Sequence, residues 1–354
     1  MMDKKNYLRG AAISFLIICS IIATKNFNIA LIISLVGSFF MVRSFGVLEY
    51  LSCAAILLAK TQSDVILSSN DLLSNVENYN AISTGASIFG VFEHGEIILP
   101  AIFWFISRFF EYANIEVMSF LFVLFFLILF YPIVYYLRHK PLVALYTVLL
   151  VDVNFIVHLF RQTFASLILL IVMIQMIKKT RFSRLNGLCL FIFSGFIHLT
   201  SYVFFPIMLL IKKTPLRLLK IIVISSALLG IVFLIKNNFF NMLVMLYGIP
   251  IVGKASYSTT VFESASGVRV IAIIATIIAL FIRDESCLFK LFLGFVALSL
   301  FFYQIPIVGC RIGLIGTSIL TGLPIGLFVY KLRHKISNSI VECKNVSYGK
   351  YHEK

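Results

Sequence analysis

Charged residues are scarce in this chain, and acidic ones are the scarcest. Lys, Arg, Asp and Glu make up 13% of the 354 residues, with 15 acidic side chains against 30 basic ones, whereas 60% are hydrophobic. The mean hydropathy is +1.02. A soluble domain of this length does not need so much apolar surface, so the composition excludes a water-soluble globular fold and indicates a lipid environment.

Several signatures of other protein classes are missing. The alternating pattern of a transmembrane strand does not occur, and the six cysteines show no metal-ligand spacing and no disulfide framework. The sequence contains no phosphate loop, serine nucleophile elbow or metal-binding cluster. We therefore expect neither a metal nor a cofactor. The apolar run 7–24 lacks a small-residue cleavage site, which favours an uncleaved first span over a signal peptide.

Apolar runs of about 16–22 residues, long enough to cross a bilayer as helices, recur along the chain. They predict an all-α, polytopic integral membrane protein with about 11 or 12 transmembrane helices, built as one multi-span domain over residues 1–354. The predicted spans are 7–24, 27–43, 45–60, 116–137, 141–159, 162–177, 186–211, 217–235, 268–283, 288–304 and 309–330.

Short basic clusters separate these runs and set the predicted topology. Placing the clusters in the cytoplasm leaves few of the 30 lysines and arginines outside, which is the positive-inside bias of membrane proteins. Both termini are then cytoplasmic, with a tail over about 331–354. The bias also explains the net charge of +15 without a nucleic-acid partner.

Two apolar segments do not fit simple crossings. Counting 97–110 as a span would place the basic cluster around Arg138 outside, so we predict an interfacial or re-entrant helix there. The run 186–211 has basic clusters at both ends but is too short for two crossings, so it predicts a broken hairpin that turns near residues 195–200. Two long outer loops are predicted, at about 61–115 and 236–267.

Arginines open three predicted spans on the outer side, against the charge bias. They are Arg161, Arg269 and Arg311, and His198 falls at the turn of the broken hairpin. A lone interfacial arginine commonly extends its side chain to the membrane surface. Three on one face favour a basic pocket beside helix N-termini, which suits phosphate. Asp152 precedes Arg161 and is expected to neutralise it.

The order of these motifs resembles a known family. "FRQTFASLILL" opens a span, "KKTRFSR" breaks it on the cytoplasmic side, and "SGFIHLTSYVFF" ends the next apolar stretch. This order resembles the EpsG-like branch of Wzy-type O-antigen and capsule polymerases. "FEHGEIILPAIFWFIS" is similar to that family's Glu-Pro-Leu-Phe helix, with Glu96 as the matching glutamate. "SSNDLLSNVENYN" is similar to its loop with Asp71 and Tyr79, and Arg311 corresponds to the arginine that opens a late span.

The resemblance implies a GT-C-like fold and a glycosyltransferase at the periplasmic face of the bacterial inner membrane. The implied reaction transfers a growing glycan from one undecaprenyl diphosphate carrier onto a fresh carrier-linked repeat unit. The implied partners are these lipid-linked repeats, the bilayer and a separate chain-length regulator protein.

Each candidate residue receives an expected role in that reaction. Arg161 and Arg311 are expected to hold the diphosphate, because fixed guanidinium groups stabilise the charge that develops on a leaving group. His198 is the first candidate base, since its intrinsic pKa lies near neutrality, and Glu96 is the second. The remaining assignments are Arg269 and Gln162 at the diphosphate, and Asp71, Tyr79 and Tyr257 at the sugar site.

Three other functions remain open at this point. A flippase for the same lipid-linked glycan would show inverted repeats and a charged path open to both faces. An O-antigen ligase would use the same donor at the same face. A membrane acyltransferase would need a cytoplasmic route for its acyl donor, and the sequence shows no suitable His-Asp or His-Arg cluster on that side.

Overall fold

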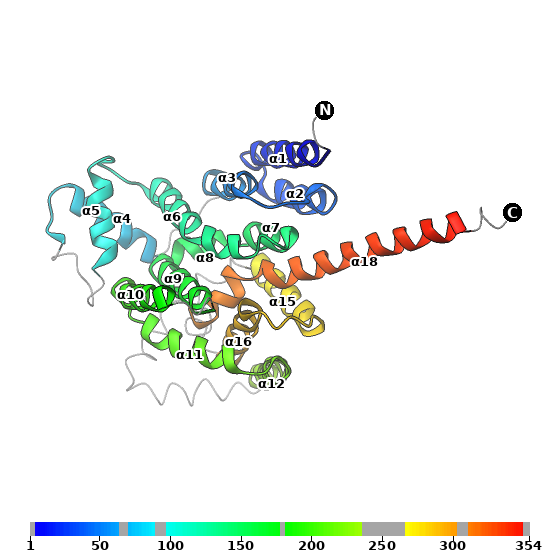
Figure 1. Ribbon diagram of the computed structural model, residues 1–354. Helices are drawn as coiled ribbons and strands as arrows, with labels where there is room; N and C mark the ends of the chain where they lie inside the picture. The colour runs from blue at the N-terminus through cyan, green and yellow to red at the C-terminus, as the bar shows by residue number, and fades with distance from the viewer. Residues whose placement is uncertain are drawn as a thin grey trace.

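The computed structural model describes residues 4–63, 70–88, 97–177, 181–235, 266–302 and 311–349. Every regular element within these ranges is helical, which confirms the predicted all-α class. Figure 1 shows the helices gathered into a bundle, with α4 and α5 at one end and α18 projecting from the other.

The bounds of the described helices follow in chain order. The first nine are α1 (Lys4–Ala23), α2 (Phe27–Met41), α3 (Val47–Ser63), α4 (Asn70–Ser83), α5 (Ile98–Ser107), α6 (Ile115–Tyr136), α7 (Pro141–Leu149), α8 (Val153–His158) and α9 (Phe160–Ile177). The others are α10 (Arg181–Ile197), α11 (Ser201–Lys213), α12 (Leu216–Ile235), α15 (Ser266–Phe281), α16 (Cys287–Phe301), the π-helix η4 (Ile315–Ile319) and α18 (Gly322–Gly349).

Burial separates a central set of helices from an outer set. The side chains of α7, of most of α9 and of the first two-thirds of α16 are buried. By contrast, α2, α12 and α15 leave large apolar side chains exposed, among them Ile32, Ile221 and Ile273 at 51–61% exposure. In water such continuous apolar faces would be a liability. They are the faces that a bilayer covers, so the chain is a membrane protein.

Three described helical stretches are long and apolar enough to cross a membrane: Ile115–Tyr136, Phe160–Ile177 and Arg311–Ser339. Six shorter apolar helices of 10–17 residues lie at other predicted spans or at the predicted interfacial segment. The sequence therefore predicted helical membrane character correctly. The expected number of crossings, about 11 or 12, is larger than the number of described helices that are long enough for a full span.

Four of the predicted cytoplasmic clusters, those of Lys140, Lys220, Arg283 and Lys331, are joined by contacts. Lys140, between α6 and α7, forms an ion pair with Asp284 in the α15–α16 connection, with 3.1 Å between Nζ and Oδ2. Lys331 on α18 donates to the carbonyl of Arg283 beside it. Lys220 on α12 donates to two carbonyls at the C-terminal end of α15. The contacts join clusters that are far apart in the sequence, as a shared face requires.

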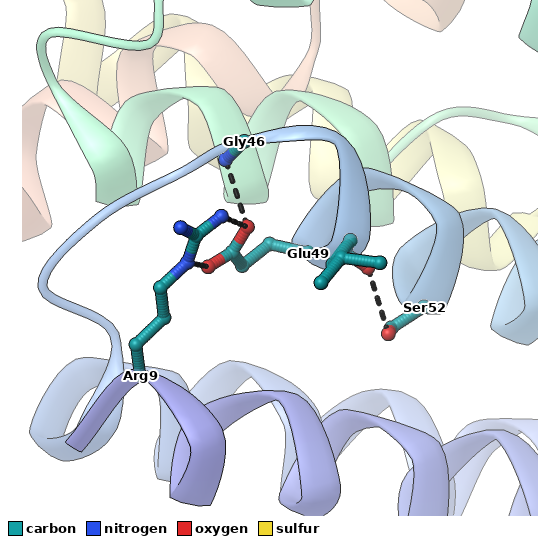
Figure 2. Close-up of polar contacts among 5 residues, drawn as sticks. Arg9, Gly46, Glu49 and Ser52 are labelled. Carbon is teal, nitrogen blue, oxygen red and sulfur yellow. Dashed lines mark hydrogen bonds and ion pairs between the residues drawn. The ribbon is translucent and has the colours of Figure 1, made fainter. Parts of the chain in front are cut away.

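An ion pair ties α1 to α3 (Figure 2). Arg9 Nε donates to Glu49 Oε1 at 2.7 Å and Arg9 Nη2 donates to Oε2 at 3.2 Å, while the Gly46 amide also donates to Oε2. Glu49 is 1% exposed. The carboxylate also lies in the first turn of α3, where the helix dipole favours negative charge. Its burial is thus matched by hydrogen bonds from α1 and from the connection before α3.

The predicted span 141–159 is wrong as one helix. α7 ends at Leu149 and α8 begins at Val153. Asp152 causes the break: its Oδ1 accepts from the amides of Asn154 and Phe155 at the start of α8, and its own amide donates to the Ser318 carbonyl. The structure therefore makes Asp152 a helix cap. Its predicted neutralisation of Arg161 stays a prediction.

The predicted outer loop at about 61–115 is also more regular than expected. It contains α4 and α5, and α5 coincides with the predicted interfacial helix at 97–110. The predicted cytoplasmic tail begins inside a helix, because α18 continues past Lys331 to Gly349. The break in the predicted hairpin lies at residues 198–200, between α10 and α11, within the predicted turn.

Glycines allow α18 to press against α7. A Cβ on Gly322 would lie 2.0 Å from the Tyr146 carbonyl oxygen, and one on Gly326 would lie 2.8 Å from the Val143 Cα. Small residues at this spacing let helix backbones approach closely within a membrane, where dispersion replaces the hydrophobic effect as the driving force. This contact fixes α18, and with it the segment that carries Arg311.

Candidate active site

Aromatic packing fixes the start of α9. The Phe160 ring stacks on Phe122 of α6 with 3.8 Å between ring centroids and 3° between ring planes, and it also contacts Phe164 one turn further on. A stack of this kind adds to the stability gained by burial. Arg161 follows directly and is half-buried, so its position is set by a rigid neighbour.

Gln162 connects the two arginine-bearing segments. It is 3% exposed, and its Nε2 donates to the backbone carbonyl of Arg311 at 2.6 Å. The residues are 149 positions apart in the chain. The start of α9, with Arg161, is thereby held against the start of the last helical stretch, with Arg311.

The segment after Arg311 packs tightly on α16. A Cβ on Gly313 would meet the Ser299 side chain at 2.5 Å, and one on Gly316 would meet the Phe292 carbonyl oxygen at 2.9 Å. The π-helix η4 follows, and its Ser318 carbonyl accepts the Asp152 amide. Short π segments are frequent at functional sites, because they insert a residue and re-aim the side chains around them.

His198 lies at the break between α10 and α11, and the ring is anchored locally. Its Nδ1 accepts the backbone N–H of Thr200 at 3.2 Å, and the Thr200 hydroxyl lies 2.8 Å from the same nitrogen. The Ser194 carbonyl accepts both the His198 amide and the Ser201 hydroxyl. Tyr202 closes over Gly195, where a Cβ would overlap its ring.

The three predicted groups share one electrostatic neighbourhood. Arg161 and Arg311 both act on the His198 ring, and Gln162 joins the segments of the two arginines. The chain geometry places this group far from the contacts around Lys331: the 20 positions from Arg311 to Lys331 run through η4 and the start of α18, and at the α-helical rise they would span about 30 Å, which is about the thickness of a bilayer core. Two guanidinium groups and an imidazole at this end form a basic site suited to a phosphate-bearing ligand.

Comparison with protein families gives the decisive observation. The model of the EpsG family matches residues 66–345, which is well over half of the chain. The chain belongs to the EpsG family. The resemblance predicted from the sequence is thus confirmed. No curated protein and no solved structure matches the chain.

Family membership indicates a polysaccharide polymerase-like role, as expected of a glycosyltransferase in polysaccharide biosynthesis. The described part of this EpsG-family protein holds no cluster of three or more His, Cys, Asp or Glu side chains that could bind a metal. The groups that the described part of the site does supply are two guanidinium groups, an imidazole and the Gln162 amide.

Tyr79, a predicted sugar-site residue, has a packing role in this EpsG-family chain. It is fully buried on α4, its hydroxyl donates to the Phe110 carbonyl, and its ring contacts Phe103 of α5 edge-on at 5.6 Å between centroids. These contacts join α4 to α5 and to the connection before α6. Its role at a sugar site stays a prediction.

The other predicted residues are placed only in part. Glu96 and Tyr257 lie outside the described residues. Asp71 and Arg269 belong to α4 and α15, but their side chains are also outside the described part of the structure. The structure thus brings together Arg161, Gln162, Arg311 and His198, and the assignment of the rest stays a prediction.

Sequence reasoning missed two residues that shape the site. Thr200 anchors the His198 ring, and a small hydroxyl residue two positions after a histidine at a helix break is a signal that would have found it. Phe160 fixes the start of α9 through its stack on Phe122. No sequence pattern distinguishes this phenylalanine from the many others, because its partner comes from another helix.

Proposed function

We propose that this EpsG-family protein is an O-antigen polymerase. In this proposal it joins oligosaccharide repeats linked to undecaprenyl diphosphate into polysaccharide, at the periplasmic face of the inner membrane. The observation that carries the proposal is the hydrogen bond from Gln162 to the Arg311 carbonyl, which holds the segment of Arg161 against that of Arg311, with His198 near enough for both charges to act on its ring. A carrier diphosphate is the part of the substrate that such a site fits.

The arginines would act on the leaving group. The acceptor hydroxyl oxygen forms a bond to the anomeric carbon of the growing glycan, and the bond from that carbon to the carrier diphosphate breaks. The electron pair of the broken bond stays on the diphosphate oxygen, where negative charge develops. Guanidinium groups already in place stabilise that charge more in the transition state than in the bound substrate, and this difference is what accelerates the transfer.

The arrangement of Gln162 supports the same assignment. Its hydrogen bond to the Arg311 backbone holds the two arginine segments together before any substrate arrives. Preorganised charge costs no rearrangement at the moment of reaction. A planar, bidentate guanidinium is also better suited than an ammonium group to grip a diphosphate.

Replacement of the arginines tests the proposal. In a strain that lacks the gene, wild-type protein should restore a ladder of long surface glycans. Arg161→Ala and Arg311→Ala should each lower the rate of chain growth about a hundredfold, and the two Lys variants should restore part of it. Arg138→Ala is the matched control, because its side chain stacks on Tyr135 between α6 and α7, among the cytoplasmic clusters.

The pattern of glycan in the deletion strain separates the alternatives. A missing polymerase leaves single repeat units attached at the surface. Repeats trapped on the cytoplasmic side would instead indicate a flippase, and complete loss of glycan from the lipid A core would indicate a ligase. Full ladders from both alanine variants would overturn the role of the arginines.

A further inference from the structure

The hydrogen bonds around His198 determine which ring nitrogen carries the proton. Nδ1 accepts the backbone N–H of Thr200 at 3.2 Å. A backbone amide only donates, so Nδ1 must offer its lone pair. The Thr200 hydroxyl, 2.8 Å from the same nitrogen, then also donates to it. In a neutral imidazole with Nδ1 as acceptor, the single proton is on Nε2.

This tautomer bears directly on the two roles open to a histidine. A ring that takes a proton from an acceptor hydroxyl needs a nitrogen lone pair directed at that hydroxyl. The lone pair of His198 is directed into the turn, at Thr200. Accepting a proton there would break hydrogen bonds to both Thr200 groups. The opposite nitrogen, Nε2, carries N–H and is a donor.

We infer that His198 is a hydrogen-bond donor to the carrier diphosphate, held in the Nε2–H tautomer by Thr200, and not the base of the reaction. The inference rests on the proposed function and refines it. Arg161 and Arg311 act on the same ring, so a donor at this point joins two guanidinium groups around one anion. Thr200 is then a positioning residue that acts through His198.

The transfer remains balanced with His198 as a donor. The glycan carbon exchanges its bond to the diphosphate for a bond to the acceptor oxygen, and the departing electron pair stays on the diphosphate. The N–H of Nε2 stabilises that charge by a hydrogen bond and keeps its proton. The proton of the acceptor hydroxyl goes to a carboxylate, for which Glu96 is the candidate that the sequence offers.

Substitution of His198 by amides tests the inference, because an amide donates but is not a base at neutral pH. The amide nitrogen of glutamine reaches about as far as Nε2, whereas that of asparagine reaches only as far as Nδ1. Polymer growth is measured in membranes of the deletion strain, which contain the strain's own lipid-linked repeats. We expect His198→Gln to retain activity within about tenfold, and His198→Ala and His198→Asn to lose about a hundredfold.

The outcomes separate this inference from the proposed function. If wild-type protein builds no polymer from the lipid-linked repeats, the proposed function fails before any His198 variant is compared. If wild-type protein is active and His198→Gln, present in normal amount, is as inactive as His198→Ala, the donor role is overturned and the polymerase role stands.

A spectroscopic readout tests Thr200 independently of activity. In protein with ¹⁵N-labelled histidine, signals missing from His198→Gln identify the His198 ring. We expect a pyridine-type shift at Nδ1 and a pyrrole-type shift at Nε2. Thr200→Val removes the hydroxyl donor but keeps the backbone N–H. It should therefore lower activity and move the Nδ1 signal, which stays pyridine-type, and Thr200→Ser should restore both properties. A pyrrole-type shift at Nδ1 in the wild-type protein would overturn the inference.

Discussion

Gln162 holds the backbone of Arg311: its amide nitrogen donates to the Arg311 carbonyl at 2.6 Å. Gln162 is 3% exposed, and the contact links the first turn of α9 to the start of the last helical stretch. The buried Gln162 amide therefore has a structural role. It sets the distance between the segment that carries Arg161 and the segment that carries Arg311. Its predicted contact with the diphosphate stays a prediction.

Loss of the hydrogen bond from Gln162 to Arg311 should impair catalysis more than folding. In Gln162→Ala the Arg311 carbonyl loses its donor, which costs about 1–3 kcal/mol of stability when no water replaces it. We expect polymer growth to fall about tenfold. Gln162→Glu should be more severe, because a carboxylate has no N–H to offer the carbonyl.

A double-mutant cycle checks the coupling. If Gln162 acts through Arg311, Gln162→Ala should have little further effect once Arg311→Ala is in place, since coupled residues are not additive. Growth rates and thermal midpoints of the two single variants and the double variant supply the measurement. Strictly additive losses in rate would show that the two side chains act separately.

The contact of α18 with α7 should tolerate no added side chain at Gly322. Its Cβ would meet the Tyr146 backbone, which cannot move as a flexible side chain can. Gly322→Ala should therefore destabilise the protein by about 1–3 kcal/mol. The control is Gly10→Ala on α1, where nothing lies within 4 Å of the added carbon and where alanine is the better helix former. Thermal unfolding in detergent distinguishes them: Gly322→Ala should melt lower than wild type, and Gly10→Ala should not.

Replacing only Arg9 of the Arg9–Glu49 ion pair should lower the stability of the protein more than replacing both residues. Arg9→Ala leaves the buried Glu49 carboxylate without its strongest partner, and we expect a loss of about 1–3 kcal/mol. Arg9→Ala/Glu49→Ala removes the stranded charge and should recover part of that loss. Thermal unfolding of the three variants decides the matter, and a double variant as unstable as the sum of the singles would contradict it.

Asp284 should make stability sensitive to acid. Burial works to raise the pKa of Asp284, but hydrogen bonds from Ser286 and the ion pair with Lys140 outweigh it and hold the pKa below its ordinary value. A carboxyl whose pKa is lowered by folding stabilises the native state above its unfolded pKa of about 4. That stability is lost as the pH falls through the folded value.

The corresponding measurement is the thermal midpoint as a function of pH. Between about pH 5 and pH 3 the midpoint of the wild type should fall more steeply than that of Asp284→Asn. Lys140→Met, which removes the ion-pair partner, should lie between the two. Parallel curves for wild type and Asp284→Asn would show that this carboxyl does not contribute.

Much of the architecture was predictable because two strong physical constraints act along the chain. Apolar runs located most helices, and the positive-inside bias grouped clusters that the structure indeed joins, such as Lys140 with the α15–α16 connection. The motif order also identified the family. Apolar runs can be seen in short stretches of sequence, and the charge bias and motif order can be seen along the whole chain. None of them requires knowledge of tertiary contacts.

Features that depend on contacts between distant segments were not predictable in the same way. The break between α7 and α8 follows from Asp152, whose amide also reaches the Ser318 carbonyl, 166 positions away. Hydropathy places Asp152 inside an apolar run and gives no hint of that acceptor. The role of Thr200 was missed for a different reason. Its contact with His198 is local in the sequence, but it is a hydrogen bond, which a hydropathy pattern does not show.

The π-helix η4 sets the direction in which Arg311 leaves the helix axis relative to α18. Such a segment holds one residue more than an α-helix would over the same stretch, and one residue corresponds to about 100° of rotation about the axis. Deleting a single position within 315–319 would therefore rotate Arg311 relative to α18, whose glycines would keep their contact with α7, and would take Gly313 out of its contact with α16. The direction of the Arg311 side chain about the helix axis thus depends on one inserted residue, and a single-codon deletion there would redirect it at the cost of the packing on α16.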